Sequence, residues 1–143
     1  RPLGLRLRLK SNMDYGMFLP IQQAAIAAIT GDQSCVERTR EAYVRRRNCL
    51  CDGFTAIGWP MERPAATMFV WAAIPSGYET SEAFAMDLVE KAGLIVTPGS
   101  AFGPSGEGYV RLALVQDEDA IRQAVDLVAV SGILSGGKSK VGR

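Results

Sequence analysis

The segment that most constrains this 143-residue chain is a glycine-rich stretch at residues 98–108. Four glycines and two prolines among these eleven residues predict an irregular loop, because both residue types interrupt helices and strands. Residues 109–115 then alternate as expected of a β-strand, whose successive side chains point to opposite faces. Arg111 lies in the middle of this strand, on the face opposite Val110 and Leu112.

A mid-strand arginine beside a glycine-rich loop is placed to hold a planar anion. Its guanidinium presents paired donors that match the two oxygens of a carboxylate, which is the ligand we expect for Arg111. The alternative is structural. Arg111 would then lie on an exposed face of the sheet or form an ion pair with Glu107 or Asp87.

Glycines and prolines also divide the rest of the chain into segments whose periodicity predicts helices or strands. We expect helices at residues 21–29, 34–57, 81–92 and 117–130, and strands at residues 67–73, 94–97 and 109–115. Leucine alternates with glycine or a basic residue over residues 3–10, a pattern that taken alone predicts an edge strand. The order predicts an α/β fold: a small two-layer sandwich, with a sheet of about three strands covered by helices on one face.

The longest predicted helix covers residues 34–57. Ser34 followed by Glu37 is typical of a capping box at a helix start, and Gly58 supplies the stop. Apolar residues recur every seven positions and form a stripe that we expect to pack on the sheet: Val36, Tyr43, Leu50 and Ile57. Four aromatic side chains outside this helix are expected in the core: Trp59, Phe69, Trp71 and Phe84.

The composition excludes several classes of function. The chain contains no histidine, which removes a His-based zinc site and a self-contained hydrolase triad. Its formal net charge of +1 predicts no overall attraction to nucleic acid or anionic lipid. No apolar run approaches the roughly 20 residues of a membrane span, so we expect no membrane partner. Three cysteines are too few for a disulfide scaffold and favour a reducing, cytoplasmic location.

Three further patterns have plain explanations. Residues 132–139 match the phosphate-loop pattern GxxxxGK[ST], but too few residues follow them to form the helix that a phosphate needs. Cys49 and Cys51 point about 200° apart on a helix and cannot chelate one metal ion without distortion. Residues 45–47 are all arginine, but acidic residues such as Glu41 share their helix, which favours a solvated face over a nucleic-acid patch.

Several motifs together resemble one enzyme family. The stretches PGSAFG (98–103) and GEGYVRLA (106–113) resemble the carboxy-terminal signature of class I/II aminotransferases. Residues 10–16, 20–22 and 66–71 resemble other segments of the same family, in the same order. The resemblance covers roughly residues 8–130 and is strongest to the branch of LL-diaminopimelate, alanine and aspartate aminotransferases.

This resemblance implies specific roles. Arg111 matches the family's arginine that binds the α-carboxylate of the substrate. Residues 11–18 resemble a segment that reaches the neighbouring subunit's active site in family homodimers, and Tyr15 is the candidate there for contact with the substrate side chain. The implied reaction moves an amino group between an amino acid and a 2-oxo acid, with pyridoxal 5'-phosphate as cofactor.

The resemblance also implies a domain organisation. Residues 1–19 match the end of the large domain and the interdomain connection, residues 20–131 match the small domain, and residues 132–143 form a flexible tail. The family's Schiff-base lysine belongs to the large domain, and Lys10 and Lys138 lack its motif context, so we expect this piece to be inactive alone. The alternative is a non-catalytic module that keeps the fold and binds anions, amino acids or a protein partner.

Overall fold

The computed structural model describes the chain except for residues 1, 14–15 and 136–143. The candidate Tyr15 therefore lies outside the described residues, as do Lys138 and the second half of the phosphate-loop match. The chain divides into two compact units, residues 1–39 and 40–143. The assignment of residues 1–19 and 20–131 to different domains stays a prediction.

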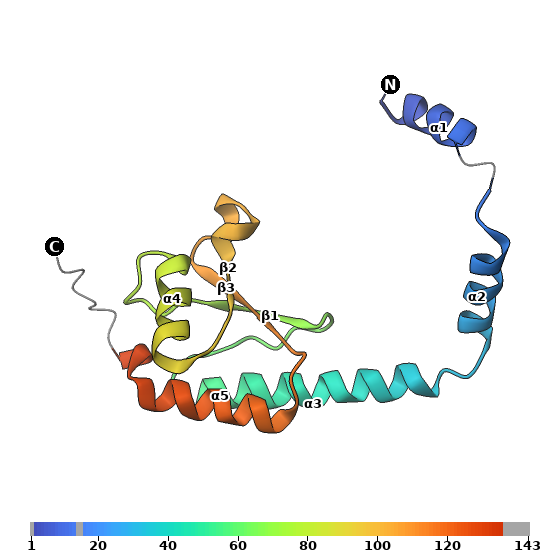
Figure 1. The fold of residues 1–143 in the computed structure, drawn as a ribbon. Helices are drawn as coiled ribbons and strands as arrows, with labels where there is room; N and C mark the ends of the chain where they lie inside the picture. Colours follow the sequence, from blue (N-terminus) through green and yellow to red (C-terminus); the bar gives the residue numbers. More distant parts are fainter. Residues whose placement is uncertain (1, 14–15, 136–143) are drawn as a thin grey trace. The chain divides into compact units, whose positions relative to one another are not determined.

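The first unit contains helix α1 (Pro2–Met13), helix α2 (Leu19–Thr30) and the start of helix α3 (Ser34–Ala56) (Figure 1). The edge strand predicted for residues 3–10 is wrong, because this segment is helical. Leucine, arginine and lysine all have high helix propensity, and a strand would need a partner that the alternation alone does not supply. The leucines of α1 are all exposed, so the alternation separates no buried face from a solvated one.

The ends of α2 and the start of α3 agree in part with the capping signals. Pro20 lies in the first turn of α2, and the backbone N–H of Gly31 donates to the carbonyl of Ala27 at its end. The capping box at Ser34 is wrong in detail. Ser34 is already helical, and its backbone N–H donates to the carboxylate of Asp32 over 3.0 Å.

The second unit is built on a three-stranded antiparallel sheet with the order β1-β3-β2. Its elements are β1 (Phe69–Ala73), α4 (Ser81–Ala92), β2 (Thr97–Pro98), β3 (Tyr109–Ala113) and α5 (Glu118–Ser131), with short 3-10 turns η1 (Gly99–Phe102), η2 (Pro104–Gly106) and η3 (Ile133–Ser135). The structure confirms the α/β fold. Of the predicted strand at residues 94–97, only its last residue lies in β2.

The helices of this unit begin and end where the caps predicted. The Thr80 side chain accepts from the N–H of Ala83 at the start of α4, and Gly93 ends that helix with φ 64°. Asp117 accepts from the N–H of Ala120 at the start of α5. Each cap satisfies backbone groups that the helix itself leaves unpaired.

One face of the sheet is buried and the other is open. Val70, Ala72, Val110 and Leu112 alternate along β1 and β3 and are all buried. They pack into a core with side chains from three helices: Leu50 and Phe54 of α3, Phe84 and Leu88 of α4, and Ile121, Val125 and Val128 of α5. Because buried and exposed side chains alternate along the strands, the sheet forms one layer and the helices on its buried face form the other, as predicted.

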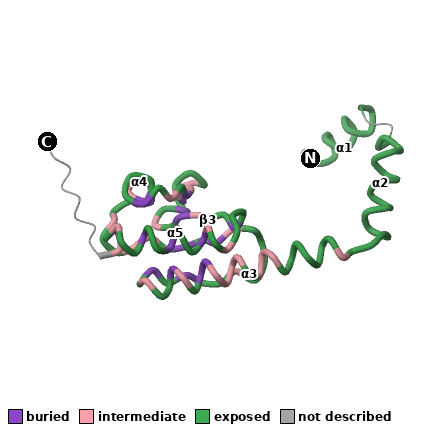
Figure 2. Tube along the Cα trace, turned by 60° about the horizontal axis from the view of Figure 1, so that its bottom comes forward, coloured by how far each residue is buried: buried purple, intermediate pink, exposed green. Residues whose placement is uncertain are grey.

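Helix α3 reaches the core only through its carboxy-terminal half. Leu50 and Phe54 are buried, whereas Val36 at the other end of the predicted stripe is 58% exposed. Gly53 allows a close approach to α5, because a Cβ there would lie 2.8 Å from Cγ2 of Val125. Figure 2 shows buried positions in the second unit, whereas α1 and α2 are exposed throughout.

The solvated face predicted for the arginines at 45–47 agrees with Arg45, whose side chain is 59% exposed, but not with Arg46 and Arg47. Arg45 pairs with Glu118 at 3.2 Å, Arg46 donates to the carbonyl of Leu114, and Arg47 donates to the carbonyl of Pro64. Arg46 and Arg47 are half-buried. These contacts join α3 to segments far away in the sequence, which helical spacing could not reveal.

The predicted flexible tail begins too early. Gly132 adopts φ 72° and ends α5, and the chain then makes the turn η3. Ile133 is only 2% exposed and belongs to the core. Gly132 thus reverses the chain after α5, and Ile133, which follows it, packs in the core.

Candidate functional site

Arg111 lies at the centre of the open sheet face. Its strand β3 is the middle strand, and the register places Trp71 of β1 on one side of it and Thr97 of β2 on the other. Residues directly opposite each other on antiparallel strands project on the same face. The open face therefore carries Trp71, Arg111 and Thr97 in one row.

Two aromatic rings hold the guanidinium of Arg111. Its Cζ atom lies 4.2 Å from the centroid of the Phe69 ring and 4.8 Å from that of the Phe102 ring. Both distances fall within the range of cation–π contacts. Trp71 supports this arrangement, with its ring edge-on to Phe102 at 5.7 Å and stacked on Tyr109 at 5.8 Å.

The hydrogen bonds of Arg111 leave donors unused. Nη2 donates to Oγ1 of Thr97 over 3.3 Å, and Nε is inaccessible to solvent without a hydrogen-bond partner in the described part of the chain. The rings and Thr97 thus orient the guanidinium without neutralising its charge. Because Nε is enclosed, a planar anion would find its donors at the terminal Nη1 and Nη2 groups.

The structural alternative had two forms. A place of Arg111 on an open face of the sheet agrees with the structure, whereas the ion pair with Glu107 or Asp87 is wrong. Glu107 Oε1 accepts from the backbone N–H groups of Ser81 at 2.6 Å and Gly108 at 2.8 Å. Asp87 pairs with Lys91 at 2.6 Å and accepts from the hydroxyl of Tyr78 at 2.7 Å. Both carboxylates are therefore engaged away from the open face.

These contacts shift the titration of both acids. The N–H of Gly108, followed by that of Ser81, stabilises the charged carboxylate and lowers the pKa of Glu107. The pKa of Asp87 is lowered first by its hydrogen bond with Lys91. Burial and the bond to Asp87 raise the pKa of Tyr78, which stays a neutral donor at physiological pH.

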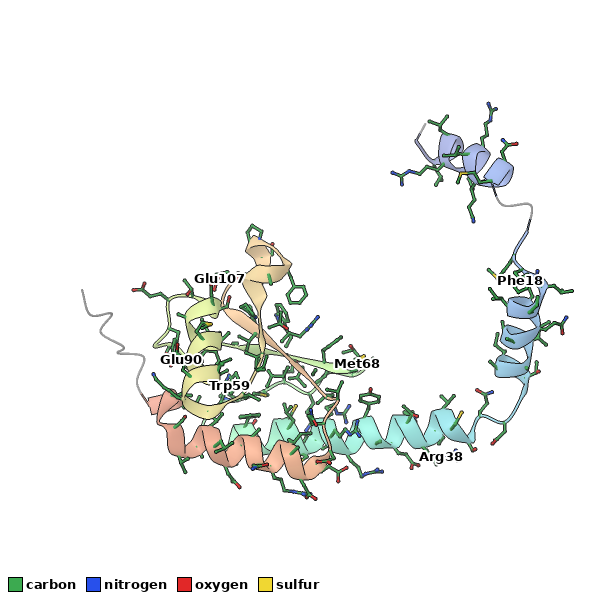
Figure 3. The ribbon with its side chains drawn as sticks, viewed as in Figure 1. Phe18, Arg38, Trp59, Met68, Glu90 and Glu107 are labelled. Atoms are coloured by element: carbon green, nitrogen blue, oxygen red, sulfur yellow. The ribbon has the colours of Figure 1, made fainter. Side chains whose placement is uncertain are left out.

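The loop that carries Phe102 is closed by two glycines. Gly99 and Gly106 lie so close that a Cβ on either would overlap with the carbonyl oxygen of the other. Figure 3 shows Glu107 at the end of this loop, beside the start of α4. The glycine-rich composition therefore serves a close backbone crossing as well as the predicted irregular turn.

The sequence predicted the place of Arg111 on its strand but missed the residues around it. Phe69 and Trp71 were expected in the core, yet Phe69 contacts the guanidinium and Trp71 is 40% exposed. Trp59 and Phe84 are buried as expected. Phe102 and Thr97 carried no signal of their own, because strand register brings Thr97 to Arg111 and the turn η1 brings Phe102 there.

Other classes of site find no support in the described residues. The three cysteines are free thiols, and Cys51 is buried. Within the described ranges, no group of three or more histidine, cysteine or acidic residues could hold a metal ion. The helices in these ranges lack the combined length and hydrophobicity of a membrane span.

Comparison with known proteins identifies the family. Residues 8–128 match the family model described as "Aminotransferase class I and II". Among curated relatives, the LL-diaminopimelate aminotransferase of Moorella thermoacetica is 45% identical over 119 residues, which cover 83% of this chain and 30% of the relative. The glutamate-pyruvate aminotransferase AlaC of Escherichia coli is 48% identical and covered to 29% of its length.

Solved structures give the same result. The substrate-bound structure of BacF from Bacillus subtilis superposes with a TM-score of 0.75 at 35% identity, over 86% of this chain and 32% of that one. The aromatic aminotransferase of Pyrococcus horikoshii gives 0.72 at 30% identity, over 78% and 31%. The chain thus spans about a third of such proteins. With Arg111 inside the matched range and the fold shared, this chain belongs to the class I and II aminotransferase family.

Proposed function

We propose that this chain acts as the substrate-orienting small domain of a pyridoxal-phosphate-dependent aminotransferase, in which Arg111 binds the α-carboxylate of the amino acid and the 2-oxo acid. The observation that carries the proposal is the guanidinium of Arg111, held between Phe69 and Phe102 without an acidic partner among the described residues. Such a cation is oriented and available to a carboxylate.

Arg111 would orient the substrate rather than break bonds. The rings of Phe69 and Phe102 lie 4.2 and 4.8 Å from Cζ of Arg111, so they limit the directions from which a carboxylate can approach the guanidinium. The bonded oxygens of the carboxylate would then fix the plane of the amino acid relative to the sheet. Partial removal of water by the two rings strengthens the charge-assisted hydrogen bonds.

The described residues do not fit a cofactor site of their own. Lys91 is paired with Asp87 near the end of α4, and Lys10 belongs to the first unit. The amino-group chemistry that pyridoxal phosphate supplies is therefore assigned to a part of the enzyme outside the described residues. The residues described here contribute binding and orientation of the substrate.

The substrates and partners belong to the proposal as well. The names of the relatives, LL-diaminopimelate aminotransferase and glutamate-pyruvate aminotransferase, support an amino acid and a 2-oxo acid as the reacting pair. We include a homodimer, with the segment around Tyr15 reaching the neighbouring active site. We also include a cytoplasmic location, for which the absence of disulfides among the three cysteines is the support.

The test is a conservative substitution in the enzyme that carries this chain. Arg111→Lys keeps the charge but loses the two-pronged donor geometry. We expect kcat/KM for amino-acid substrates to fall roughly 30- to 1,000-fold, equivalent to about 2–4 kcal/mol. Unchanged kcat/KM in the variant would refute the assigned role.

The matched control is Arg122→Lys on α5. Arg122 is exposed and pairs with Asp119 at 2.5 Å, so its replacement should leave kcat/KM within about twofold. The wild-type protein also distinguishes the proposal from a non-catalytic module. Binding of alanine or pyruvate that depends on Arg111, without any amino transfer in the presence of pyridoxal phosphate, would favour the module.

A further inference from the structure

We propose that Glu107 and Ser81 are positioning residues that hold the Phe102 ring over Arg111 and thereby set the affinity for carboxylate. The inference rests on the proposed function, because it assumes that Arg111 binds the substrate carboxylate. It concerns residues that touch neither the guanidinium nor a ligand. Their effect would pass through the loop that carries Phe102.

Ser81 ties down this loop on both sides of Phe102. Its hydroxyl accepts from the backbone N–H of Ser100 over 3.3 Å and lies 3.3 Å from the Ser100 hydroxyl. Its own backbone N–H donates to Glu107 over 2.6 Å. Ser81 is fully buried at the start of α4, so one fixed residue of a rigid helix contacts both ends of the loop.

Glu107 closes the second of these ends. One carboxylate oxygen, Oε1, accepts from Ser81 of α4 and from Gly108 at the start of β3. It thus joins the loop to the helix and to the strand that carries Arg111. Charge-assisted bonds of this kind are shorter and stronger than neutral ones.

Phe102 depends on this anchoring because it is not held by burial. The residue is 53% exposed, and within the described part of the chain its ring contacts the Trp71 ring and the guanidinium of Arg111. A ring at the tip of a loop follows the position of the loop's ends. If Glu107 no longer holds one end, Phe102 will leave the guanidinium for part of the time and water will reach that face of Arg111.

The first experiment observes Arg111 directly in the full chain. The Nε–H of Arg111 should show an NMR signal shifted by the rings of Phe69 and Phe102, with slow exchange because Nε is inaccessible. Glu107→Ala should move this signal toward that of an exposed arginine and speed its exchange. Glu107→Gln should restore much of the wild-type signal, because an amide oxygen can still accept from Ser81.

The matched control is Glu82→Ala. This change removes a carboxylate from the first turn of α4, the turn that contains Ser81, the partner of Glu107. Glu82 is exposed and forms no hydrogen bond or ion pair within the described part of the chain, so its loss should leave the Arg111 signal unchanged. An Arg111 signal that is the same in Glu107→Ala as in wild type would overturn the inference. A thermal melt of each variant shows that the comparison is between folded proteins.

The second experiment is a double-mutant cycle on the KM for the amino acid in the enzyme that carries this chain. Glu107→Ala and Phe102→Ala should each raise KM roughly 3- to 10-fold and change kcat less than twofold, as expected for partial loss of a cation–π contact. The double variant should be no worse than Phe102→Ala alone, because Glu107 acts through that ring.

The outcomes separate the two proposals. If Arg111→Lys leaves KM and kcat/KM unchanged, the proposed function fails and the link to affinity fails with it, whatever the NMR signal shows. If Arg111→Lys is impaired but the effects of Glu107→Ala and Phe102→Ala add fully, the proposed function stands and the positioning role is wrong.

Discussion

The central residue of the candidate site is Arg111, whose charge is not paired with an acidic side chain among the described residues. The rings of Phe69 and Phe102 contact the guanidinium of Arg111, and Thr97 accepts one of its hydrogen bonds. A neighbouring carboxylate would orient it equally well but would compete with a substrate. Aromatic rings orient a cation without supplying a competing acceptor.

The pH dependence of Glu107 provides a prediction at the same scale. Its pKa is lowered in the folded chain, so its contribution to stability is present above the usual carboxyl pKa and is lost as the pH falls through the lowered value. The stability difference between wild type and Glu107→Gln should therefore be largest near neutral pH and shrink in acid. Chemical denaturation across this range measures it, and a difference that grows in acid would contradict the prediction.

A strained residue gives a second prediction. Thr67, just before β1, has φ 80°, a conformation that is costly for a β-branched side chain. Thr67→Gly should raise the free energy of unfolding by about 0.5–1 kcal/mol, after allowing for the entropy that glycine adds to the unfolded chain. The control Ala66→Gly adds the same entropy without relieving strain, and should be neutral or destabilising in the same denaturation assay.

At the scale of elements, the packing of α3 on α5 depends on a missing side chain. A Cβ at Gly53 would lie 2.8 Å from Cγ2 of Val125, which is 8% exposed. The stiffness of a β-branched residue leaves it little freedom to move aside. Glycine at position 53 therefore allows α3 and α5 to come this close at Val125.

Gly53→Ala should lower the free energy of unfolding by about 1 kcal/mol, because the clash exceeds the gain in helix propensity. In a Val125→Ala background the same change should be neutral or stabilising, since the clashing methyl groups are gone. Thermal or urea unfolding of the four proteins measures the coupling. A destabilisation that persists without the Val125 methyls would show that the close approach is not the cause.

The elements of the second unit show which bounds of helices and strands can be predicted from the sequence. The boundaries of α4 and α5 follow from Thr80, Gly93 and Asp117, because capping is a local interaction. The short strand β2 was predicted over residues 94–97 but covers only Thr97–Pro98. Its extent is decided by pairing with β3, which no local pattern reports.

At the scale of the whole molecule, the two faces of the sheet differ: one packs in the core and the other carries the candidate site. The covered face is apolar and packs against three helices, whereas the open face carries Trp71, Tyr109 and Arg111. A site on the open face can change without disturbing the core. Substitutions of Arg111 should thus lower the proposed affinity for a substrate carboxylate far more than the free energy of unfolding.

The division into two units predicts that the stability of the second unit does not depend on residues 1–33. The buried hydrophobic residues run from Leu50 to Ile133, and no residue of α2 is buried. Removal of residues 1–33 should therefore change the free energy of unfolding of the remaining chain by less than about 0.5 kcal/mol. Denaturation monitored by the fluorescence of Trp59 and Trp71, both in the remaining chain, tests this, and a larger loss would show that the first unit stabilises the second.

The sequence by itself determined the family, the α/β class, the caps of α4 and α5 and the place of Arg111 in mid-strand, because motifs, caps and alternation are local patterns. Only the tertiary structure decided that residues 3–10 form a helix, that Arg45 to Arg47 have distant partners, and that Phe69, Thr97 and Phe102 surround Arg111. Those residues meet through strand register and loop closure, which join positions far apart in the chain.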